Sequence, residues 1–507
     1  MDDLGPIDDA VRTVFDDLSA RRAVDRLWSR DHTLWQDDPT EVADRLGWLD
    51  VAGAMATQAE RLEVFADALM AEGIAHAVVM GMGGSSLFPE VLARSFAPRS
   101  DRPSLRVLDT TDPATVARVA HECPPDETVF IASSKSGTTI ETLSHLASVL
   151  DRTEDPSHVV VVTDPDTPLA ERAQTERFRA LFENPADIGG RYSALSFFGL
   201  VPAAAAGVDV AALLASADGA QAALRNPDPG ANPGLRLAAA MAGAVRSGRD
   251  KLTLVVDGEI ETISLWLEQL VAESTGKNGT GVIPIAGEPL GPPAVYGDDR
   301  LFVGIGDHRG LAPLAAAGHP VVEVPSHGAA GLGELVLTWE VATALCGAAL
   351  GINPFDQPNV AEAKAATARV LEDGPADIET TAVADLLAGV KPGDYVAIQA
   401  YVDPEAGVVD AISDARTSIR DRHRVATTVG LGPRFLHSTG QLHKGGPPSG
   451  VFLQVVGDDP GDMAIPGQPF GFSALKRAQA EGDLRTLQAR GLRAGRVTLD
   501  DLLEVSR

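Results

Sequence analysis

The apolar residues of this chain fall into short runs that alternate with segments of helical spacing. Two helical patterns, at residues 8–30 and 51–71, come first. Short apolar runs separated by amphipathic helices are typical of parallel βαβ units, and they predict a doubly wound sheet in the next part of the chain. Its strands are expected at 74–80, 105–109, 128–132 and 159–163, with helices at 88–96, 113–121 and 139–150.

The same alternation begins again near residue 235 and predicts a second module of the same kind. Its strands are expected at 251–256, 301–305 and 321–324, and its helices at 234–246, 261–273, 310–317 and 331–350. After about residue 375 the pattern predicts strands at 395–401 and 451–456, helices at 408–422 and 473–490, and between the strands a loop at 432–450 that is rich in His, Lys and Gly.

We therefore expect an α/β protein built from two doubly wound parallel-sheet modules and a smaller C-terminal α/β domain. The Pro-, Gly- and Asn-rich stretch at 226–232 is the expected linker between the modules. The expected segments are a helical part at 1–70, modules at 71–230 and 231–374, and the C-terminal domain at 375–507.

Composition narrows the class of protein. A chain of 507 residues with 44% hydrophobic residues can form several packed cores, and its formal net charge of −29 argues against nucleic acid as a partner. Cys123 and Cys346 have no metal-ligand spacing and are interpreted as packing residues. The N-terminus lacks the regions of a signal peptide, and no stretch of about 18 uncharged apolar residues is present, so we expect a cytoplasmic protein without a membrane span.

The helix expected at 261–273 carries a carboxylate close to its end and runs into a glycine-rich turn. Gln269 and Glu273 are four residues apart, so they lie on the same helix face. A carboxylate fixed on a largely buried helix can act as a proton-abstracting base. A solvated glutamate near a helix end is the plainer interpretation, and spacing alone does not decide between the two.

Two turns rich in glycine or hydroxyl groups follow predicted strands of the first module. Residues 81–86 read Gly-Met-Gly-Gly-Ser-Ser, and residues 133–139 read Ser-Ser-Lys-Ser-Gly-Thr-Thr. Hydroxyls and backbone N–H groups at a helix N-terminus favour a phosphate group, although ordinary tight turns and helix caps use the same residues. Two such turns at strand ends favour a ligand in the crevice of an open α/β sheet.

Three further segments carry candidate cations and histidines. Arg191 follows two glycines, and an arginine so placed can stabilise an oxyanion or enediolate. Lys364 lies on a helix expected after residue 358. His437 and His443 are six residues apart in the C-terminal loop, a spacing that does not form a helical metal pair but allows proton transfer. In isolation, a surface or structural position is the plainer interpretation of each.

Together these segments resemble the phosphoglucose isomerase family in a bacterial form, over roughly residues 70 to 370. The resemblance implies two sugar isomerase modules and an aldose–ketose isomerase that interconverts glucose 6-phosphate and fructose 6-phosphate by proton transfer through an enediolate after ring opening. The matching motifs are Gly83-Gly-Ser85, Ser134-Lys-Ser-Gly-Thr-Thr139, Gly189-Gly-Arg-Tyr-Ser193, Gln269-x-x-x-Glu-Ser-x-Gly-Lys277 and Phe355-Asp-Gln-x-x-Val-x-x-x-Lys364.

The resemblance assigns a role to each matching residue. It implies that Glu273 is the base that moves a proton between C1 and C2, that Arg191 stabilises the enediolate, and that Lys364 assists ring opening. It implies no metal ion and no cofactor. The remaining implied contacts are Ser85, Ser134, Ser136 and Thr139 for the substrate phosphate, and Gly84, Lys135 and Gln269 for the rest of the sugar.

One expected residue is missing from its usual place. The family's catalytic histidine lies between the glutamate and lysine motifs in a Gly-Gln-His context, which none of the three histidines in that interval has. The better candidate is His437, because the C-terminal loop resembles the isomerase half of fused transaldolase–isomerase proteins; His443 is second. The resemblance also implies a functional link to transaldolase and a homodimer, although a displaced histidine leaves the role of the second subunit open. The histidines in the interval are His308, His319 and His327.

Two other functions stay open at this point. A non-catalytic sugar-phosphate sensor needs the phosphate turns but has no use for Glu273, Arg191 and Lys364 together. An isomerase that acts on mannose 6-phosphate, or on both epimers, needs the same residues, and the sequence does not identify the pocket residue that decides the sugar.

Overall fold

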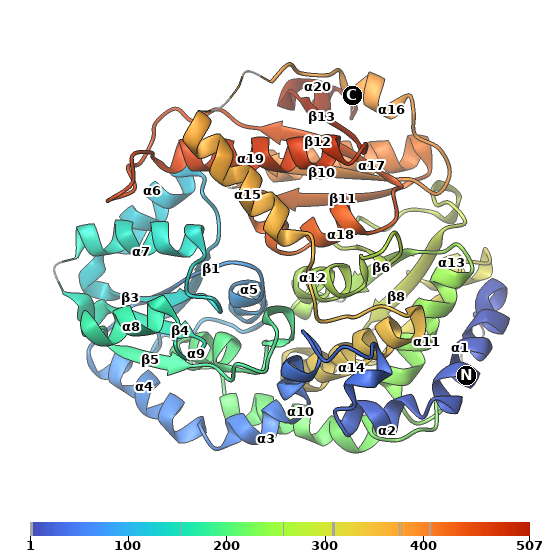
Figure 1. The fold of residues 1–507 in the computed structure, drawn as a ribbon, viewed down its shortest axis with the longest axis horizontal. Helices are drawn as coiled ribbons and strands as arrows, with labels where there is room; N and C mark the ends of the chain where they lie inside the picture. Colours follow the sequence, from blue (N-terminus) through green and yellow to red (C-terminus); the bar gives the residue numbers. More distant parts are fainter. Residues whose placement is uncertain are drawn as a thin grey trace.

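The computed structural model describes residues 4–153, 155–256, 258–306, 310–374, 376, 378–404 and 407–506. Three fully parallel sheets lie around a centre in which two helices are seen end-on (Figure 1). The first sheet has the strand order β2-β1-β3-β4-β5. Its strands are β1 (His76–Gly81), β2 (Ser104–Leu108), β3 (Thr128–Ser133), β4 (Val159–Thr163) and β5 (Ala180–Glu183).

The other two sheets have four strands each. The second runs β7-β6-β8-β9 and the third β11-β10-β12-β13, and every pair of neighbours is parallel. Their strands are β6 (Lys251–Val256), β7 (Ile283–Ile285), β8 (Arg300–Ile305), β9 (Val321–Val324), β10 (Tyr395–Tyr401), β11 (Ala426–Leu431), β12 (Gly450–Val456) and β13 (Arg493–Val497). The expected α/β class with parallel sheets is confirmed.

All nine predicted strands are present, and the four that the pattern missed are all edge strands: β5, β7, β11 and β13. An edge strand is covered on fewer sides than a central one, so its sequence needs less apolar character. The apolar pattern is lost in two ways. Strand β13, Arg-Ala-Gly-Arg-Val, contains two arginines, and strand β7 has only three residues.

The helices predicted after residue 71 are present at the expected positions, but the expected loop at 432–450 contains a 3-10 turn at Arg434–His437 and a short helix at Gly440–Gly445. The N-terminal part also differs from the prediction. The pattern at 8–30 predicted one helix, but the structure has α1 (Asp8–Ala20) and α2 (Ala23–Trp28), separated where Arg22 takes a left-handed conformation with φ of 51°. The pattern at 51–71 is likewise divided into α3 (Val51–Ala56) and α4 (Ala59–Ala71).

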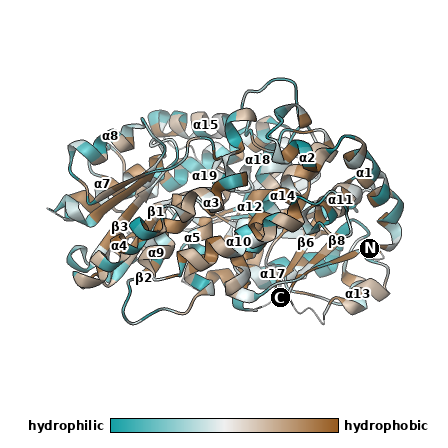
Figure 2. Cartoon of the chain, turned by 90° about the horizontal axis from the view of Figure 1, so that it is seen from below, coloured by the Kyte–Doolittle hydropathy of each residue, from teal (hydrophilic) through white to brown (hydrophobic). Residues whose placement is uncertain are grey.

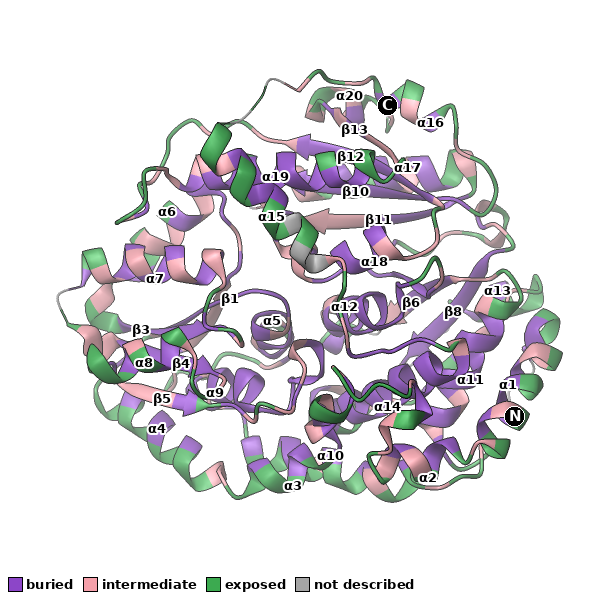
Figure 3. Ribbon diagram, viewed as in Figure 1, coloured by how far each residue is buried: buried purple, intermediate pink, exposed green. Residues whose placement is uncertain are grey.

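The remaining helices cover the sheets. Hydrophobic colour follows the strands and the inner helix faces in Figure 2. The outer faces of the helices carry the exposed positions (Figure 3). The helices are α5 (Leu87–Ser95), α6 (Pro113–Glu122), α7 (Ile140–Arg152), α8 (Pro168–Thr175), α9 (Phe197–Ala205), α10 (Val210–Leu224), α11 (Pro233–Arg246), α12 (Ile263–Thr275), α13 (Ala312–Ala316), α14 (Leu332–Leu350), α15 (Val360–Asp373), α16 (Val383–Leu387), α17 (Val408–His423), α18 (Gly440–Gly445), α19 (Phe472–Ala489) and α20 (Leu499–Glu504).

The N-terminal helices pack on both modules. Helix α1 contacts α11 and α14, whereas α4 contacts α9. Within the described residues, one stretch, Gly328–Leu350, is long and apolar enough to cross a membrane, but 89% of its most apolar window is buried inside the protein. Helix α14 is therefore a core helix against which α10, α11 and α12 pack.

The C-terminal domain rests on both modules. On the second module, the backbone N–H and the hydroxyl of Thr427 donate to Oε1 of Glu288 at 3.0 and 2.8 Å, and Arg416 of α17 donates from Nη2 to the carbonyl of Ala286 at 2.8 Å. On the first module, Lys476 of α19 contacts Asp112 at 2.9 Å. Breaking one partner of a buried pair costs about 3–5 kcal/mol, so these contacts fix the domain firmly in place.

Candidate functional site

A cavity of about 470 Å³ lies where the two modules and the C-terminal domain meet. Its walls come from the ends of β1 and β3, the turn after β5, helices α12 and α15, and the 3-10 turn η12 (Arg434–His437) of the C-terminal domain. Ten of the eleven site residues expected from the sequence line this one cavity: Gly84, Ser85, Lys135, Ser136, Thr139, Arg191, Gln269, Glu273, Lys364 and His437.

Glu273 reaches the cavity from a helix that is buried on nearly every side. Its side chain is only 9% exposed, and Arg191 Nη1 lies 3.4 Å from its Oε1. Gln269, one turn earlier on α12, donates from Nε2 to Glu273 Oε2 at 3.1 Å and to the carbonyl of His437 at 2.8 Å. The carboxylate is therefore fixed by an arginine and an amide, and the interpretation as a solvated glutamate is wrong.

Arg191 is buried as well, with a side chain 4% exposed. Its Nε donates to Ser274 Oγ at 2.8 Å, and its Nη2 donates to the carbonyls of Pro354 and Asp356 at 2.7 and 2.8 Å. These bonds leave Nη1 directed at Glu273. Because a rigid guanidinium loses little freedom on binding, it suits stabilisation of a developing oxyanion.

Lys277 supports the same loop from the end of α12. Its Nζ donates to the carbonyl of Asn353 and to Oδ1 of Asp356, both at 2.6 Å. Burial lowers the pKa of Lys277 to about 7. Lys277 does not line the cavity, so we regard it as a residue that holds the loop before α15 against α12.

The glycine turn after β1 allows close contact between three segments. Gly83 has φ of +56°, and a Cβ on it would lie 2.5 Å from the carbonyl oxygen of His437. A Cβ on Gly84 would lie 1.9 Å from the carbonyl oxygen of Gly190. Only glycine fits at these two positions, because the turn, the Arg191 segment and the His437 segment touch through their backbones.

The hydroxyl turn after β3 presents some of its expected residues to the cavity. Ser136 and Thr139 line it, but Ser134 does not: its side chain is buried and its Oγ is hydrogen-bonded to Thr139 Oγ1 at 2.9 Å. The contact of Ser134 with the phosphate stays a prediction, and in this structure its hydroxyl supports Thr139 instead of lining the cavity. Lys135 lines the cavity while forming an ion pair with Asp164.

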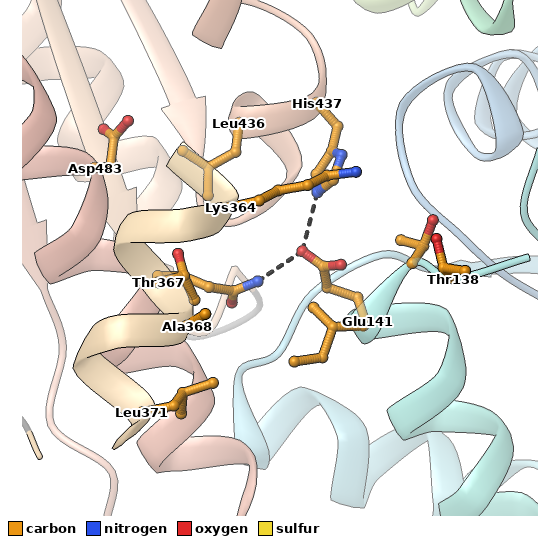
Figure 4. A pocket seen from close by; sticks show the side chains of 12 residues that line it. Thr138, Glu141, Lys364, Thr367, Ala368, Leu371, Leu436, His437 and Asp483 are labelled. Carbon is orange, nitrogen blue, oxygen red and sulfur yellow. Dashed lines mark hydrogen bonds and ion pairs between the residues drawn. The ribbon is translucent and has the colours of Figure 1, made fainter. Parts of the chain in front are cut away.

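His437 enters the cavity from η12 and is held by a buried carboxylate. Its Nε2 lies 2.9 Å from Oε1 of Glu141, which also accepts a 2.6 Å hydrogen bond from Gln479 Nε2 (Figure 4). Gln479 Oε1 in turn accepts from Thr111 Oγ1 at 2.7 Å. Burial acts to raise the pKa of Glu141, but the charge and hydrogen bond of His437 outweigh burial and lower it.

Lys364 lies beside His437 at the boundary of a second cavity of about 270 Å³, whose lining is drawn in Figure 4. Both side chains line both cavities. Lys364 is exposed on α15, so a cation and an imidazole from two different elements share one opening.

The other candidate histidines that the structure describes do not line the cavity. His443 is packed among Tyr395, Phe435 and Phe452, and burial lowers its pKa to about 3, so the second choice for the catalytic histidine is wrong. His319 stacks edge-on against Tyr296 and Phe302, and neither it nor His327 lines the cavity. His308 lies outside the described residues.

Comparisons with known proteins agree with this geometry. The sequence profile described as phosphoglucose isomerase matches residues 49–285. A glucose-6-phosphate isomerase of Rubrobacter xylanophilus is 30% identical over 370 residues, which cover 60% of this chain and 84% of that protein. The chain belongs to the phosphoglucose isomerase family. A glucose-6-phosphate isomerase of Heliobacterium modesticaldum is 28% identical over 421 residues, covering 70% of this chain and 91% of that protein.

Solved structures support the same fold. A hypothetical protein of Thermus thermophilus matches with a TM-score of 0.60 at 26% identity, over 70% of this chain and 97% of that chain. A glucose-6-phosphate isomerase of Chlamydia trachomatis matches with a TM-score of 0.61, over 72% of this chain and 86% of that chain, and at 19% identity it supports the fold alone.

The phosphoglucose isomerase profile ends at residue 285, before Lys364 and His437. The place of these two residues in the site therefore comes from the geometry of the cavity. Sequence reasoning missed Glu141 and Gln479, which orient His437, and Arg45, which lines the cavity from the N-terminal part. Glu141 lies two residues after Thr139, at the start of α7, and only the fold shows that this helix faces η12.

Proposed function

We propose that this protein is a glucose-6-phosphate isomerase, which interconverts glucose 6-phosphate and fructose 6-phosphate through an enediolate after ring opening. The observation that carries the proposal is Glu273: a buried carboxylate, fixed by Gln269 and Arg191, that faces a cavity opening between three domains. Membership of the phosphoglucose isomerase family supports the same activity.

The proton transfer needs a base and a cation at neighbouring atoms. Glu273 removes the proton from the carbon next to the carbonyl and returns it to the adjacent carbon. The enediolate that forms between these steps carries negative charge on oxygen, and the Nη1 group of Arg191, 3.4 Å from Glu273, lies on the side where that charge develops.

Ring opening needs a proton donor and acceptor on the other side of the sugar. His437 serves this step, and Glu141 holds its Nε2 in place, so the imidazole presents its other edge to the cavity. Lys364 shares the same opening and supplies a positive charge near the ring oxygen. Ser85, Ser136 and Thr139 hold the phosphate at the helix N-termini across the cavity.

The decisive experiment replaces Glu273 with glutamine and measures two quantities. The first is isomerisation, and the second is incorporation of deuterium from solvent into the C2 position of the sugar. We expect Glu273→Gln to retain sugar-phosphate binding while both rates fall by several orders of magnitude, because Gln cannot accept the proton. The matched control is Glu63→Gln, at an exposed position on α4.

Near-normal turnover in Glu273→Gln would rule out its role as the base. Tight sugar-phosphate binding by the parent protein without any deuterium incorporation would instead favour a non-catalytic sensor. Assays with mannose 6-phosphate test the remaining alternative, an isomerase that accepts both epimers. Glucose 6-phosphate is the proposed substrate because the named relatives are glucose-6-phosphate isomerases.

The setting of the enzyme follows from the same assignment. We propose a role in glycolysis and gluconeogenesis in the cytoplasm, which family membership and the burial of α14 support. Homodimer formation and a functional link to transaldolase stay predictions from the sequence.

A further inference from the structure

A second large cavity, of about 360 Å³, lies behind the elements that carry the catalytic side chains. On α12, Gln269 and Glu273 line the active-site cavity, whereas Glu268 lines this rear cavity. On η12, His437 lines the active-site cavity, whereas Arg434 lines the rear cavity. The wall between the two cavities is therefore made of the segments that carry the base and the histidine.

The rear cavity contains polar groups that the protein leaves unpaired. Glu268 is only 8% exposed, yet it forms no hydrogen bond and no ion pair with any residue of the described ranges. Thr262 Oγ1, which lines the same cavity, is also buried without a partner among those residues. Buried polar groups are almost always hydrogen-bonded, so a largely buried carboxyl that lines a cavity without a partner, next to an unpaired threonine hydroxyl, points to a ligand.

Two guanidinium groups face the same space. Arg416 is 4% exposed, and its Nε and Nη2 donate to Thr427 and Ala286, but in the described part of the chain its Nη1 has no acceptor. Arg434 donates from Nε and Nη2 to Asp109, and its Nη1 likewise has no acceptor there. In each arginine, two guanidinium nitrogens are thus hydrogen-bonded within the protein, and the third can donate to a ligand.

The charges around Glu268 favour an anion. Arg434 is balanced by Asp109, and the lining pair of α5, Arg94 and Glu90, is joined at 3.2 Å. The charge of Arg416 is not matched by any carboxylate within ion-pair distance in the described ranges. Burial raises the pKa of Glu268 to about 8, so at neutral pH its neutral acid form predominates and can donate a proton in a hydrogen bond.

We propose that the rear cavity binds a small organic carboxylate, of the size of a di- or tricarboxylic acid, between Arg416 and the side chain of Glu268. The carboxylate oxygens accept from Nη1 of Arg416 and Arg434, and from the acid of Glu268 and the hydroxyl of Thr262. Charge-assisted hydrogen bonds from arginine to a carboxylate are stronger than bonds between neutral groups, so the arginines supply most of the affinity.

Binding there is coupled to the active site through the shared wall. A ligand that contacts Glu268 and Arg434 bears on the same helix and turn that position Glu273 and His437. Any such coupling is reciprocal, so the sugar phosphate also changes the affinity for the carboxylate. The coupling rests on the proposed isomerase function; the binding site does not.

Calorimetric titration of the full-length protein with citrate and with succinate tests the site. The titrations are made with saturating fructose 6-phosphate present, so that the active site is occupied. We expect saturable binding at pH 7 that falls by about tenfold or more in Glu268→Leu and in Thr262→Val, since each removes a donor. Glu268→Gln keeps a neutral donor and should bind at pH 7 as the parent does.

The pH dependence of affinity distinguishes binding at this site from a nonspecific attraction of the anionic ligand to positive charges. Above pH 8 the carboxyl of Glu268 ionises and repels the ligand, so the parent should lose affinity while Glu268→Gln does not. Burial lowers the pKa of Arg416 to about 10, and against the effect of burial Asp109 raises the pKa of Arg434, so both arginines stay charged if the comparison is made between pH 7 and about 9. The other charged groups of the lining, Arg94 and Glu90, are joined to each other. This comparison remains decisive even if Glu268→Leu fails to fold.

Three results would overturn the proposal. The first is that neither acid gives a heat of binding at millimolar concentration. The second is that binding disappears when fructose 6-phosphate is present. The third is that both Thr262→Val and Glu268→Leu bind the acid as the parent does. If citrate binds but leaves kcat and KM of the isomerase unchanged, the coupling is rejected and the site stands. A protein that binds citrate without isomerase activity would reject the proposed function alone.

Discussion

The carboxylate of Glu141 offers the sharpest test of how His437 is positioned. Glu141 is 3% exposed, and its Oε1 accepts from both His437 and Gln479. Glu141→Gln keeps the size of the side chain but removes its charge. Both hydrogen bonds go to Oε1, and an amide oxygen can also accept two, so the substitution weakens these bonds by removing the charge rather than by removing an acceptor.

The size of the effect follows from the hydrogen bonds that change. A hydrogen bond to a charged group contributes about 1.5–3 kcal/mol and one between neutral groups about 0.5–1.5 kcal/mol, so the loss is about 1–2 kcal/mol. We therefore expect kcat of Glu141→Gln with glucose 6-phosphate to fall about 5- to 30-fold, with little change in KM.

The assay compares the natural sugar with an analogue that lacks the ring-closing hydroxyl. His437 and its partner serve ring opening, so Glu141→Gln should slow the cyclic substrate but leave deuterium exchange in the open-chain analogue nearly unchanged. Asp151→Asn, at an exposed position of the same helix, is the matched control. An equal loss with both substrates, or no loss with either, would refute the positioning role of Glu141.

Three further predictions use the same structure. Ser134→Ala should raise KM by less than about tenfold, whereas Thr139→Val should raise it more, because only Thr139 lines the cavity; steady-state kinetics decides. Burial raises the pKa of Glu268 to about 8, so the contribution of its neutral form to the free energy of unfolding is full below pH 4.5 and is lost as the pH rises toward 8. Urea unfolding should therefore show Glu268→Gln gaining stability relative to the parent over that pH range. Specific activity should stay constant when the protein is diluted below the concentration at which any dimer dissociates, because His437 belongs to the same chain as Glu273. Sedimentation velocity at the same concentrations gives the oligomeric state.

The sequence predicted every central strand of the described sheets but only two of their six edge strands, β2 and β9. Central strands such as β3, Thr-Val-Phe-Ile-Ala-Ser, are buried at every position and therefore read as continuous apolar runs. Edge strands have fewer covered faces, and β13 keeps half-exposed arginines. The break between α1 and α2 at Arg22 could not be predicted either. A left-handed conformation is expected at glycine, and an arginine at that position does not interrupt the helical pattern of apolar residues.

For the site, the sequence predicted the residues whose motifs are local. Glu273 and Gln269 share a helix face, and Ser136 and Thr139 share a turn, so spacing alone brings each pair together. Glu141 and Gln479 are 338 positions apart, and their contact depends on how α19 packs on the first module. No local pattern encodes such a contact. Ser134 belongs to such a local motif but does not line the cavity, since a motif fixes the residue type and not the direction of its side chain.

The position of His437 explains why the C-terminal domain is part of the active site. The histidine reaches the cavity only because η12 is fixed between Gln269 of α12 and Glu141 of α7, one from each module. A group supplied by the same chain costs no translational entropy when the site forms, whereas a group from a second subunit is lost on dilution. The Lys476–Asp112 ion pair and the hydrogen bonds from Thr427 to Glu288 at the domain contacts then serve catalysis indirectly, because they hold the C-terminal domain, and with it His437, against the two modules.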